Sequence, residues 1–177
     1  MWDSFLNSNL SDINVVITDI DGTLTDGGMY YATSGETFKR FHVQDGLGVK
    51  LLQAIGVPVA IISADRSSTT INRAKKLDIE HCYVGVDDKV LVLKSVCEKL
   101  GQTPNHVAYL GDDLQDFDVM KCVGYPVAVG NAHALIKTIA SYVCQKSGGE
   151  GAFREFSERL IVAKGYDVLD VLKCLGT

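Results

Sequence analysis

An apolar run that ends in two carboxylates constrains this chain most. Residues 15–18 read Val-Val-Ile-Thr, a β-branched stretch typical of a strand buried on both faces of a parallel sheet. Asp19 and Asp21 follow directly, and Gly22 comes next. Open α/β sheets place their ligand sites at the carboxyl ends of strands, and a buried carboxylate is costly unless a metal or polar group satisfies it. The stretch therefore predicts a strand that carries acidic side chains to a functional site.

Short apolar stretches alternate with helical patterns along most of the chain. The strand-like stretches lie at residues 15–18, 58–63, 81–84, 107–110, 125–129 and 142–144, and the helical patterns at residues 46–55, 68–77, 89–100, 115–123 and 132–140. Such alternation predicts an α/β fold with a doubly wound, Rossmann-like parallel sheet. The length and the lack of a linker predict a single domain over residues 1–177.

Two segments depart from this alternation. Residues 27–42 place aromatic side chains on two arms around Thr33-Ser34-Gly35, which predicts a small β-hairpin protruding from the main sheet. An isolated hairpin is marginally stable in water, so we expect a flap over the carboxylates or an oligomer contact, with an edge hairpin of the core as the alternative. Residues 147–177 form a tail in which a glycine-rich turn opens a helix that runs through Val162.

The composition argues against nucleic acid and membranes as binding partners. The net charge of -5 disfavours binding to nucleic acid or to an anionic membrane surface, which favour a basic face. Five dispersed cysteines without a C-x-x-C pair predict reduced thiols in a cytoplasmic protein. We expect no signal peptide, and no apolar run approaches the ~20 residues of a membrane helix.

Four segments carry chemistry in a fixed order, each near the end of a predicted strand. They are Asp19-x-Asp21, Ser63, Lys89 and Gly111-Asp112-Asp113. Carboxylates, a hydroxyl and an ammonium at one sheet edge suit phosphoryl transfer, in which one carboxylate attacks phosphorus and another transfers protons. Hard Mg²⁺ takes oxygen ligands and bridges carboxylate and phosphate.

These segments predict specific roles. Asp19 is the candidate nucleophile, Asp21 the acid/base and Asp112 a metal ligand, while Asp113 and Asp116 support them. Ser63 and Lys89 would hold phosphate oxygens; taken singly, they also fit a strand-end cap and a solvated helix start. A calcium loop is disfavoured, because Tyr30 stands where such a loop needs glutamate.

The same residues resemble the four motifs of the haloacid dehalogenase superfamily of phosphatases. Asp19-Ile20-Asp21-Gly22-Thr23 is similar to the first motif, Ser63 to the second, Lys89 to the third and Gly111-Asp112-Asp113 to the fourth. The resemblance implies that Mg²⁺ is bound by Asp19, by the backbone carbonyl of Asp21 and by Asp112. The spacing leaves no room for a large cap domain.

The hairpin and the late glycine-rich string are similar to those of the capless 3-deoxy-D-manno-octulosonate 8-phosphate phosphatases. The resemblance implies a homotetramer in which a neighbouring subunit and the tail close the site. We accordingly expect removal of the residues after Lys146 to change turnover or product release more than stability. The implied substrate-binding residues are His42, Val43, Gln44, Asp45, Gly46, Lys50, Arg66, Arg73 and Arg154.

The residues favour a Mg²⁺-dependent phosphatase that works through an aspartyl-phosphate, and the resemblance implies that it belongs to lipopolysaccharide sugar-acid biosynthesis and hydrolyses 3-deoxy-D-manno-octulosonate 8-phosphate. The chain departs from the octulosonate pattern in two places, so a nine-carbon, sialic-acid-like 9-phosphate is an alternative substrate. Lys50 stands where an arginine is usual, and Ser63-Ala64-Asp65-Arg66 replaces a Thr-Gly-Arg string. A non-catalytic oligomerisation module related to the C-terminal domains of cytidylyltransferases is a further alternative, as is a phosphotransferase or mutase, which the missing cap disfavours.

Overall fold

The computed structural model describes residues 9–33 and 37–176, and these form a six-stranded parallel sheet. Its order is β5-β4-β1-β6-β7-β8. The strands are β1 (Val15–Thr18), β4 (Val59–Ile62), β5 (His81–Tyr83), β6 (Val107–Gly111), β7 (Tyr125–Ala128) and β8 (Tyr142–Val143). The predicted doubly wound α/β fold is therefore confirmed.

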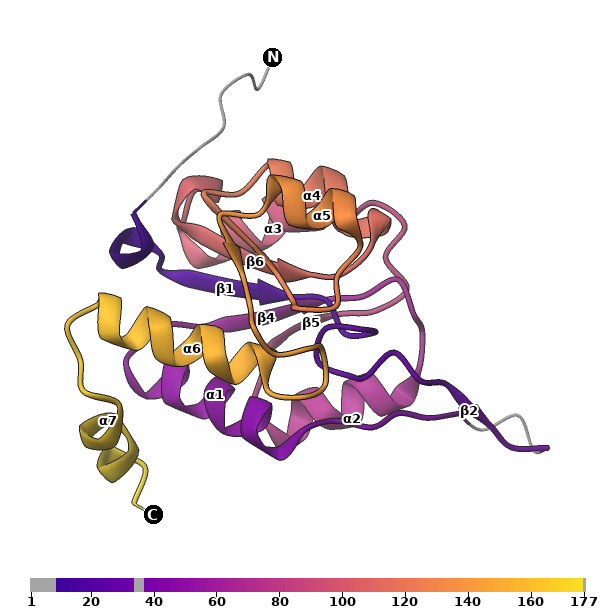
Figure 1. Cartoon of the computed structure of the whole chain (residues 1–177), viewed down its shortest axis with the longest axis horizontal. Coiled ribbons are helices and arrows are strands. Elements are labelled where there is room, and N and C mark those ends of the chain that lie inside the picture. The colour runs from indigo at the N-terminus through magenta and orange to yellow at the C-terminus, as the bar shows by residue number, and fades with distance from the viewer. Residues whose placement is uncertain (1–8, 34–36, 177) are drawn as a thin grey trace.

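Helices cover both faces of this sheet (Figure 1), with α1, α2 and α6 on one side and α3, α4 and α5 on the other. The α-helices are α1 (Val43–Ala54), α2 (Ser68–Lys76), α3 (Lys89–Leu100), α4 (Phe117–Lys121), α5 (Ala134–Ile139), α6 (Ala152–Ala163) and α7 (Val168–Cys174). Short 3-10 turns lie at η1 (Leu10–Asp12), η2 (Pro104–His106) and η3 (Leu114–Asp116). None of the helices in the described ranges has the length and apolar character needed to cross a bilayer.

The order of the strands places the reversal of the winding beside β1. From β1 the chain adds β4 and then β5 on one side, returns to pair β6 with the other side of β1, and continues to β7 and β8. Every residue of β1, β4, β6 and β7 is buried, as both faces of a covered parallel sheet require. The carboxyl ends of β1 and β6 therefore border the crevice in which such folds bind their ligands.

The predicted hairpin is present and stands apart from the main sheet. Tyr30–Tyr31 (β2) pairs antiparallel with Thr37–Phe38 (β3), and the two arms project beyond the sheet (Figure 1). The tip, residues 34–36, lies outside the described residues. Because β2 and β3 form their own two-stranded sheet, the alternative of an edge hairpin of the core is wrong.

The tail packs against the body of the domain, which argues against the expectation that removing it changes turnover or product release more than stability. Helix α6 packs along α1, and the side chains of Phe153, Phe156 and Leu160 are fully buried in the main core. Helix α7 was not predicted from the periodicity, although Asp167 gives a local signal: its carboxylate accepts the N–H groups of Leu169 and Asp170 at the helix start. The segment beyond Lys146 is thus part of the folded domain.

Candidate active site

A cavity of about 380 Å³ opens at the carboxyl edge of the sheet. Its acidic and hydroxyl lining comes from Asp19, Asp21, Ser63, Asp65, Asp112, Asp113 and Asp116. Asp19 and Asp21 follow β1, Ser63 follows β4, and Asp112 and Asp116 follow β6. The parallel topology therefore brings together acids that lie almost a hundred residues apart in the chain.

Lys89 supplies the buried positive charge of this site. Its ammonium lies 3.0 Å from Asp19 Oδ1 and donates a hydrogen bond to Asp116 Oδ1 at 2.7 Å. The lysine is the first residue of α3, whose start is capped by the Asp88 carboxylate. With its side chain 6% exposed, Lys89 is not the solvated helix start that the sequence also allowed.

Asp116 is the acid most completely enclosed by donors. It is 0% exposed and accepts hydrogen bonds from the Lys89 ammonium, from the Tyr109 hydroxyl at 2.8 Å and from the Asp112 N–H at 3.0 Å. A buried carboxylate with three donors is stabilised and fixed in place. Sequence reasoning missed Tyr109, because an aromatic residue within an apolar strand gives no sign of a polar role.

Burial and a neighbouring charge raise the pKa of two carboxylates of the site. Burial, followed by the charge of Asp116, raises the pKa of Asp19 to about 7, against the opposing effect of Lys89. Burial and Asp116 likewise raise the pKa of Asp112 to about 7. Burial alone would lower the pKa of Lys89, but Asp19 and Asp116 outweigh it, so the net shift is upward and the lysine stays charged. The site thus holds more negative than positive charge.

This donor set fits a hard divalent cation. Oxygen atoms of Asp19, Asp112 and Asp116 all lie within 4.8 Å of one another. Since three donors already hold Asp116, Asp19 and Asp112 are the carboxylates able to face an ion, and the Thr23 hydroxyl orients Asp112 by donating to its Oδ1 at 3.0 Å. Mg²⁺ prefers such oxygen ligands, and its charge would offset the excess of carboxylates.

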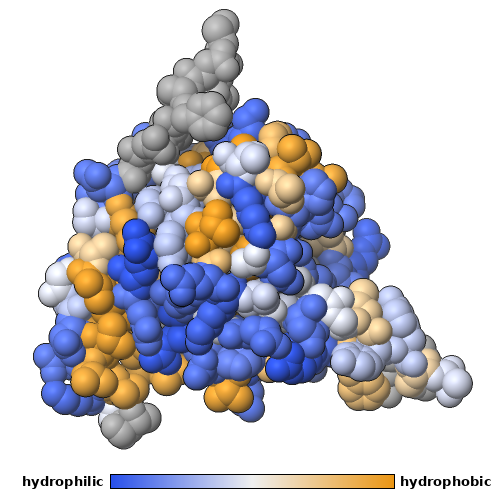
Figure 2. Space-filling view, viewed as in Figure 1, coloured by the Kyte–Doolittle hydropathy of each residue, from blue (hydrophilic) through white to orange (hydrophobic). Residues whose placement is uncertain are grey.

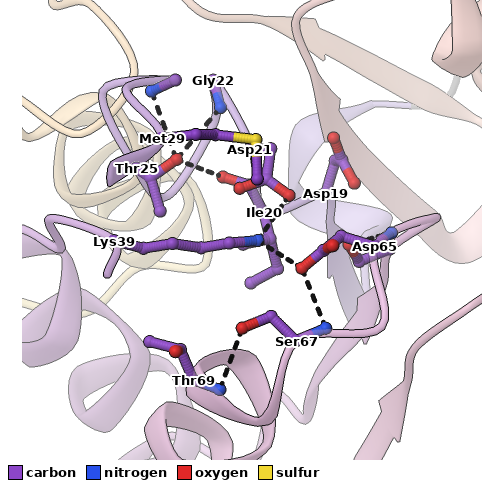
Figure 3. A network of polar contacts seen from close by, with 12 residues as sticks. Asp19, Ile20, Asp21, Gly22, Thr25, Met29, Lys39, Asp65, Ser67 and Thr69 are labelled. Carbon is purple, nitrogen blue, oxygen red and sulfur yellow. Dashed lines mark hydrogen bonds and ion pairs between the residues drawn. The ribbon is translucent and has the colours of Figure 1, made fainter. Parts of the chain in front are cut away.

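A second cluster joins the hairpin to the site (Figure 3). The Lys39 ammonium donates to Asp21 Oδ2 at 2.7 Å and to Asp65 Oδ2 at 2.6 Å. Burial lowers the pKa of Lys39, but the two carboxylates raise it further, so the net shift is upward. Sequence reasoning missed Lys39, because one lysine in an aromatic-rich arm gives no signal without the tertiary contact.

The glycine-rich turn supports the loop after β1 within the same chain. The Gly149 N–H donates to the Thr23 carbonyl at 3.0 Å. A Cβ on Gly148 would lie 1.6 Å from the Gly22 carbonyl oxygen, so the approach of these two backbones requires glycine. The turn therefore packs against the loop that carries Asp21 and limits its movement.

Asp45 belongs to the packing of α1 against α6. It is 2% exposed, and its two carboxylate oxygens accept the N–H groups of Gly151 and Arg154 at 3.3 and 2.9 Å. An acid at a helix N-terminus satisfies amides that lack partners within the helix. The structure thus gives Asp45 a helix-capping role, and its predicted contact with substrate stays a prediction.

The other residues predicted to bind substrate do not line the described cavity. Arg73 donates to the His42 carbonyl at 3.2 Å and lies 5.3 Å from the centre of the Phe41 ring. Lys50 pairs with Asp78, beyond the end of α2 that is remote from the cavity.

The remaining members of the set are placed as follows. Arg66 packs over Gly85. Arg154 pairs with Glu158 at 2.7 Å. Val43 and Gln44 are exposed in the first turn of α1, and Gly46 faces the Arg73 guanidinium. Their binding roles stay predictions.

Comparisons with known proteins agree with this geometry. A model of the haloacid dehalogenase-like hydrolase family matches residues 85–155. The 3-deoxy-D-manno-octulosonate 8-phosphate phosphatase of Escherichia coli is 40% identical over 154 residues, which cover 87% of this chain and 82% of that protein.

Solved structures give the same result. The Yersinia pestis 3-deoxy-D-manno-octulosonate 8-phosphate phosphatase superposes with a TM-score of 0.87 at 38% identity, over 90% of this chain and 86% of that one. The Moraxella catarrhalis phosphatase of the same name, in complex with magnesium ion, phosphate ion and a KDO molecule, has a TM-score of 0.89 at 35% identity, over 96% of both chains.

Proposed function

The chain belongs to the haloacid dehalogenase-like hydrolases, in the family of the 3-deoxy-D-manno-octulosonate 8-phosphate phosphatases, and on that premise we propose its reaction. It is a Mg²⁺-dependent phosphatase that hydrolyses the terminal phosphate of 3-deoxy-D-manno-octulosonate 8-phosphate. The observation that carries this proposal is the convergence of Asp19, Asp112 and Lys89 on one edge of the sheet.

The first half of the proposed reaction forms a covalent intermediate on Asp19. A carboxylate oxygen of Asp19 attacks phosphorus, the bond from phosphorus to the sugar oxygen breaks, and Asp21 gives its proton to the departing alkoxide. Lys89, 3.0 Å from Asp19, and Ser63 at the end of β4 hold the phosphate oxygens against the nucleophile.

The second half restores the enzyme. The Asp21 carboxylate takes a proton from water, the water oxygen attacks phosphorus, and the bond to Asp19 breaks to release inorganic phosphate. Asp19, Asp112 and the backbone carbonyl of Asp21 would hold Mg²⁺, which would supply the charge neutralisation that lets an anionic carboxylate approach an anionic phosphate. Asp116 and Asp113 support these groups from the loop after β6.

A homotetramer in the cytoplasm belongs to the same proposal. Met29, Tyr30, Tyr31 and Phe38 are exposed on the hairpin, which protrudes in Figure 2 with pale and light-orange surface. Apolar side chains gathered on a protruding element favour contact with another copy of the chain. The five free cysteines agree with a reducing compartment. Mass measurement of the native assembly tests the tetramer.

Hydrolysis of candidate sugar-acid phosphates tests the reaction and the substrate together. We expect the highest kcat/KM with 3-deoxy-D-manno-octulosonate 8-phosphate, activity that EDTA removes and Mg²⁺ restores, and no turnover by Asp19→Asn with its fold retained. Normal turnover by Asp19→Asn would remove this residue from the nucleophilic role.

A nine-carbon 9-phosphate is the second candidate, favoured by the acid at Asp65 in the cavity lining. A higher kcat/KM for that compound would move the assignment to it. Inactivity of the Mg²⁺-loaded protein toward every sugar-acid phosphate and toward p-nitrophenyl phosphate would instead favour a non-catalytic module.

A further inference from the structure

Lys39 sits on a protruding hairpin, yet its side chain is 0% exposed. A lysine on such an element normally extends into water, because burying an ammonium is costly unless it is paired. This one turns inward from the base of the hairpin and ends between two carboxylates that line the cavity (Figure 3).

The ammonium joins three separate segments. It comes from the arm after β3, it reaches Asp21 on the loop after β1, and it reaches Asp65 on the loop after β4. Asp65 is itself fixed there: its Oδ2 accepts the Ser67 N–H at 2.9 Å, and its own N–H donates to the Ser63 hydroxyl at 3.2 Å. Lys39 is therefore anchored on a rigid part of the site and not on the hairpin alone.

We propose that Lys39 is a positioning residue for the acid/base Asp21, and that Asp65 holds the Lys39 ammonium in the place this requires. The hydrogen bond engages Asp21 Oδ2, and Asp21 lines the cavity, so its other oxygen would carry out the proton transfer. A tether for the hairpin would need only the Asp65 contact, whereas the second contact acts on the residue that transfers the proton. This inference rests on the proposed function and gives a residue of the hairpin a part in the reaction.

The choice of leaving group separates positioning of Asp21 from a structural role. An alkoxide leaving from a sugar phosphate needs a proton, whereas p-nitrophenolate leaves without one. Because kcat/KM covers only the steps through departure of the leaving group, a badly placed Asp21 lowers it for the sugar phosphate alone. A general loss of packing or phosphate binding lowers kcat/KM for both substrates.

The test compares Lys39→Met with wild type on 3-deoxy-D-manno-octulosonate 8-phosphate and on p-nitrophenyl phosphate. We expect kcat/KM to fall about 10- to 100-fold for the sugar phosphate, mainly through kcat, and less than about 3-fold for the aryl phosphate. Lys39→Arg, which can still donate to both carboxylates, should recover most of the loss. Equal losses on the two substrates, or none, would overturn the proposal.

Two further variants complete the design. Arg40→Met is the matched control, because Arg40 is the adjacent cation but pairs with Asp26 and Glu150; it should leave the ratio of the two kcat/KM values unchanged. Asp65→Asn should shift that ratio in the direction of Lys39→Met, and the double variant should lose no more than Lys39→Met.

These outcomes are distinguishable from failure of the proposed reaction. The part assigned to Asp65 would be refuted if the double variant lost kcat/KM by the product of the two single losses. It would also be refuted if Asp65→Asn left the ratio of the two kcat/KM values unchanged. The Asp65→Asn variant also carries the test if Lys39→Met does not fold. A wild-type protein inactive on the sugar phosphate would refute the proposed function, whereas an active wild type with an unshifted ratio in Lys39→Met refutes only this inference.

Discussion

Affinity for Mg²⁺ should rise steeply with pH through neutrality, because protons compete with the cation for the same oxygens. The pKa values of Asp19 and Asp112 in the metal-free site are both about 7. An acid with that pKa is roughly 10% ionised at about pH 6 and roughly 90% at about pH 8. If both carboxyls must ionise before Mg²⁺ binds, the fraction of protein able to bind rises from about 1% to about 80%, so affinity should increase about 100-fold. If only one particular carboxyl must ionise, the increase should be about 10-fold.

Calorimetric titration of the metal-free protein with Mg²⁺ at the two pH values measures this directly. Titrations in buffers of different ionisation enthalpy should report release of about one proton per ion near pH 7, and about two below it. Asp112→Asn removes one titrating ligand, so its weaker affinity should depend less steeply on pH. A change in wild-type affinity of less than about 3-fold between the two pH values would refute the electrostatic reasoning.

The same shifts predict how the stability of the metal-free chain depends on pH. A carboxyl whose folded-state pKa lies above its unfolded value favours folding while protonated and loses that contribution as pH rises through the folded pKa. Without Mg²⁺ the melting temperature should therefore fall between about pH 4 and about pH 7 through Asp19 and Asp112. Added Mg²⁺ should raise it most at the upper end of this range.

Three substitutions test the structural roles assigned above. Asp45→Ala should leave two amides at the buried start of α6 unpaired and cost about 2–4 kcal/mol of unfolding free energy, measured by urea denaturation, with KM little changed; a raised KM with unchanged stability would favour the substrate role. Phe156→Ala should cost about 3–5 kcal/mol in the same assay, since its ring is fully buried, and a negligible cost would show that the tail adds little to the stability of the core. Gly148→Ala places a Cβ 1.6 Å from the Gly22 carbonyl oxygen and should lower both the melting temperature and kcat; wild-type values would show that the turn can move away.

The acids of the site could be predicted from the sequence because they follow strands with a local signature, whereas Lys89 could be predicted only from its place in the order of the four segments. Residues 15–18 and 107–110 are apolar runs that end in carboxylates, and a parallel sheet brings such ends to one edge. The structure places Asp19, Lys89 and Asp112 together as that argument requires.

Local signals did not reveal the residues that act through contacts distant in sequence. Lys39 gains its role only when its side chain reaches the loops after β1 and β4. Asp45 gains its role only when α6, more than a hundred residues further along the chain, packs against α1. In the sequence Tyr109 has the features of any buried strand residue. Only the tertiary structure shows that its hydroxyl donates a hydrogen bond to Asp116.

Periodicity and strand ends were thus determined by the sequence alone, since they depend on how neighbouring residues face solvent or core. Which polar groups meet was decided by the tertiary structure. A buried charge must find partners wherever packing supplies them, and here the sheet order and the docking of α6 and the hairpin supply them.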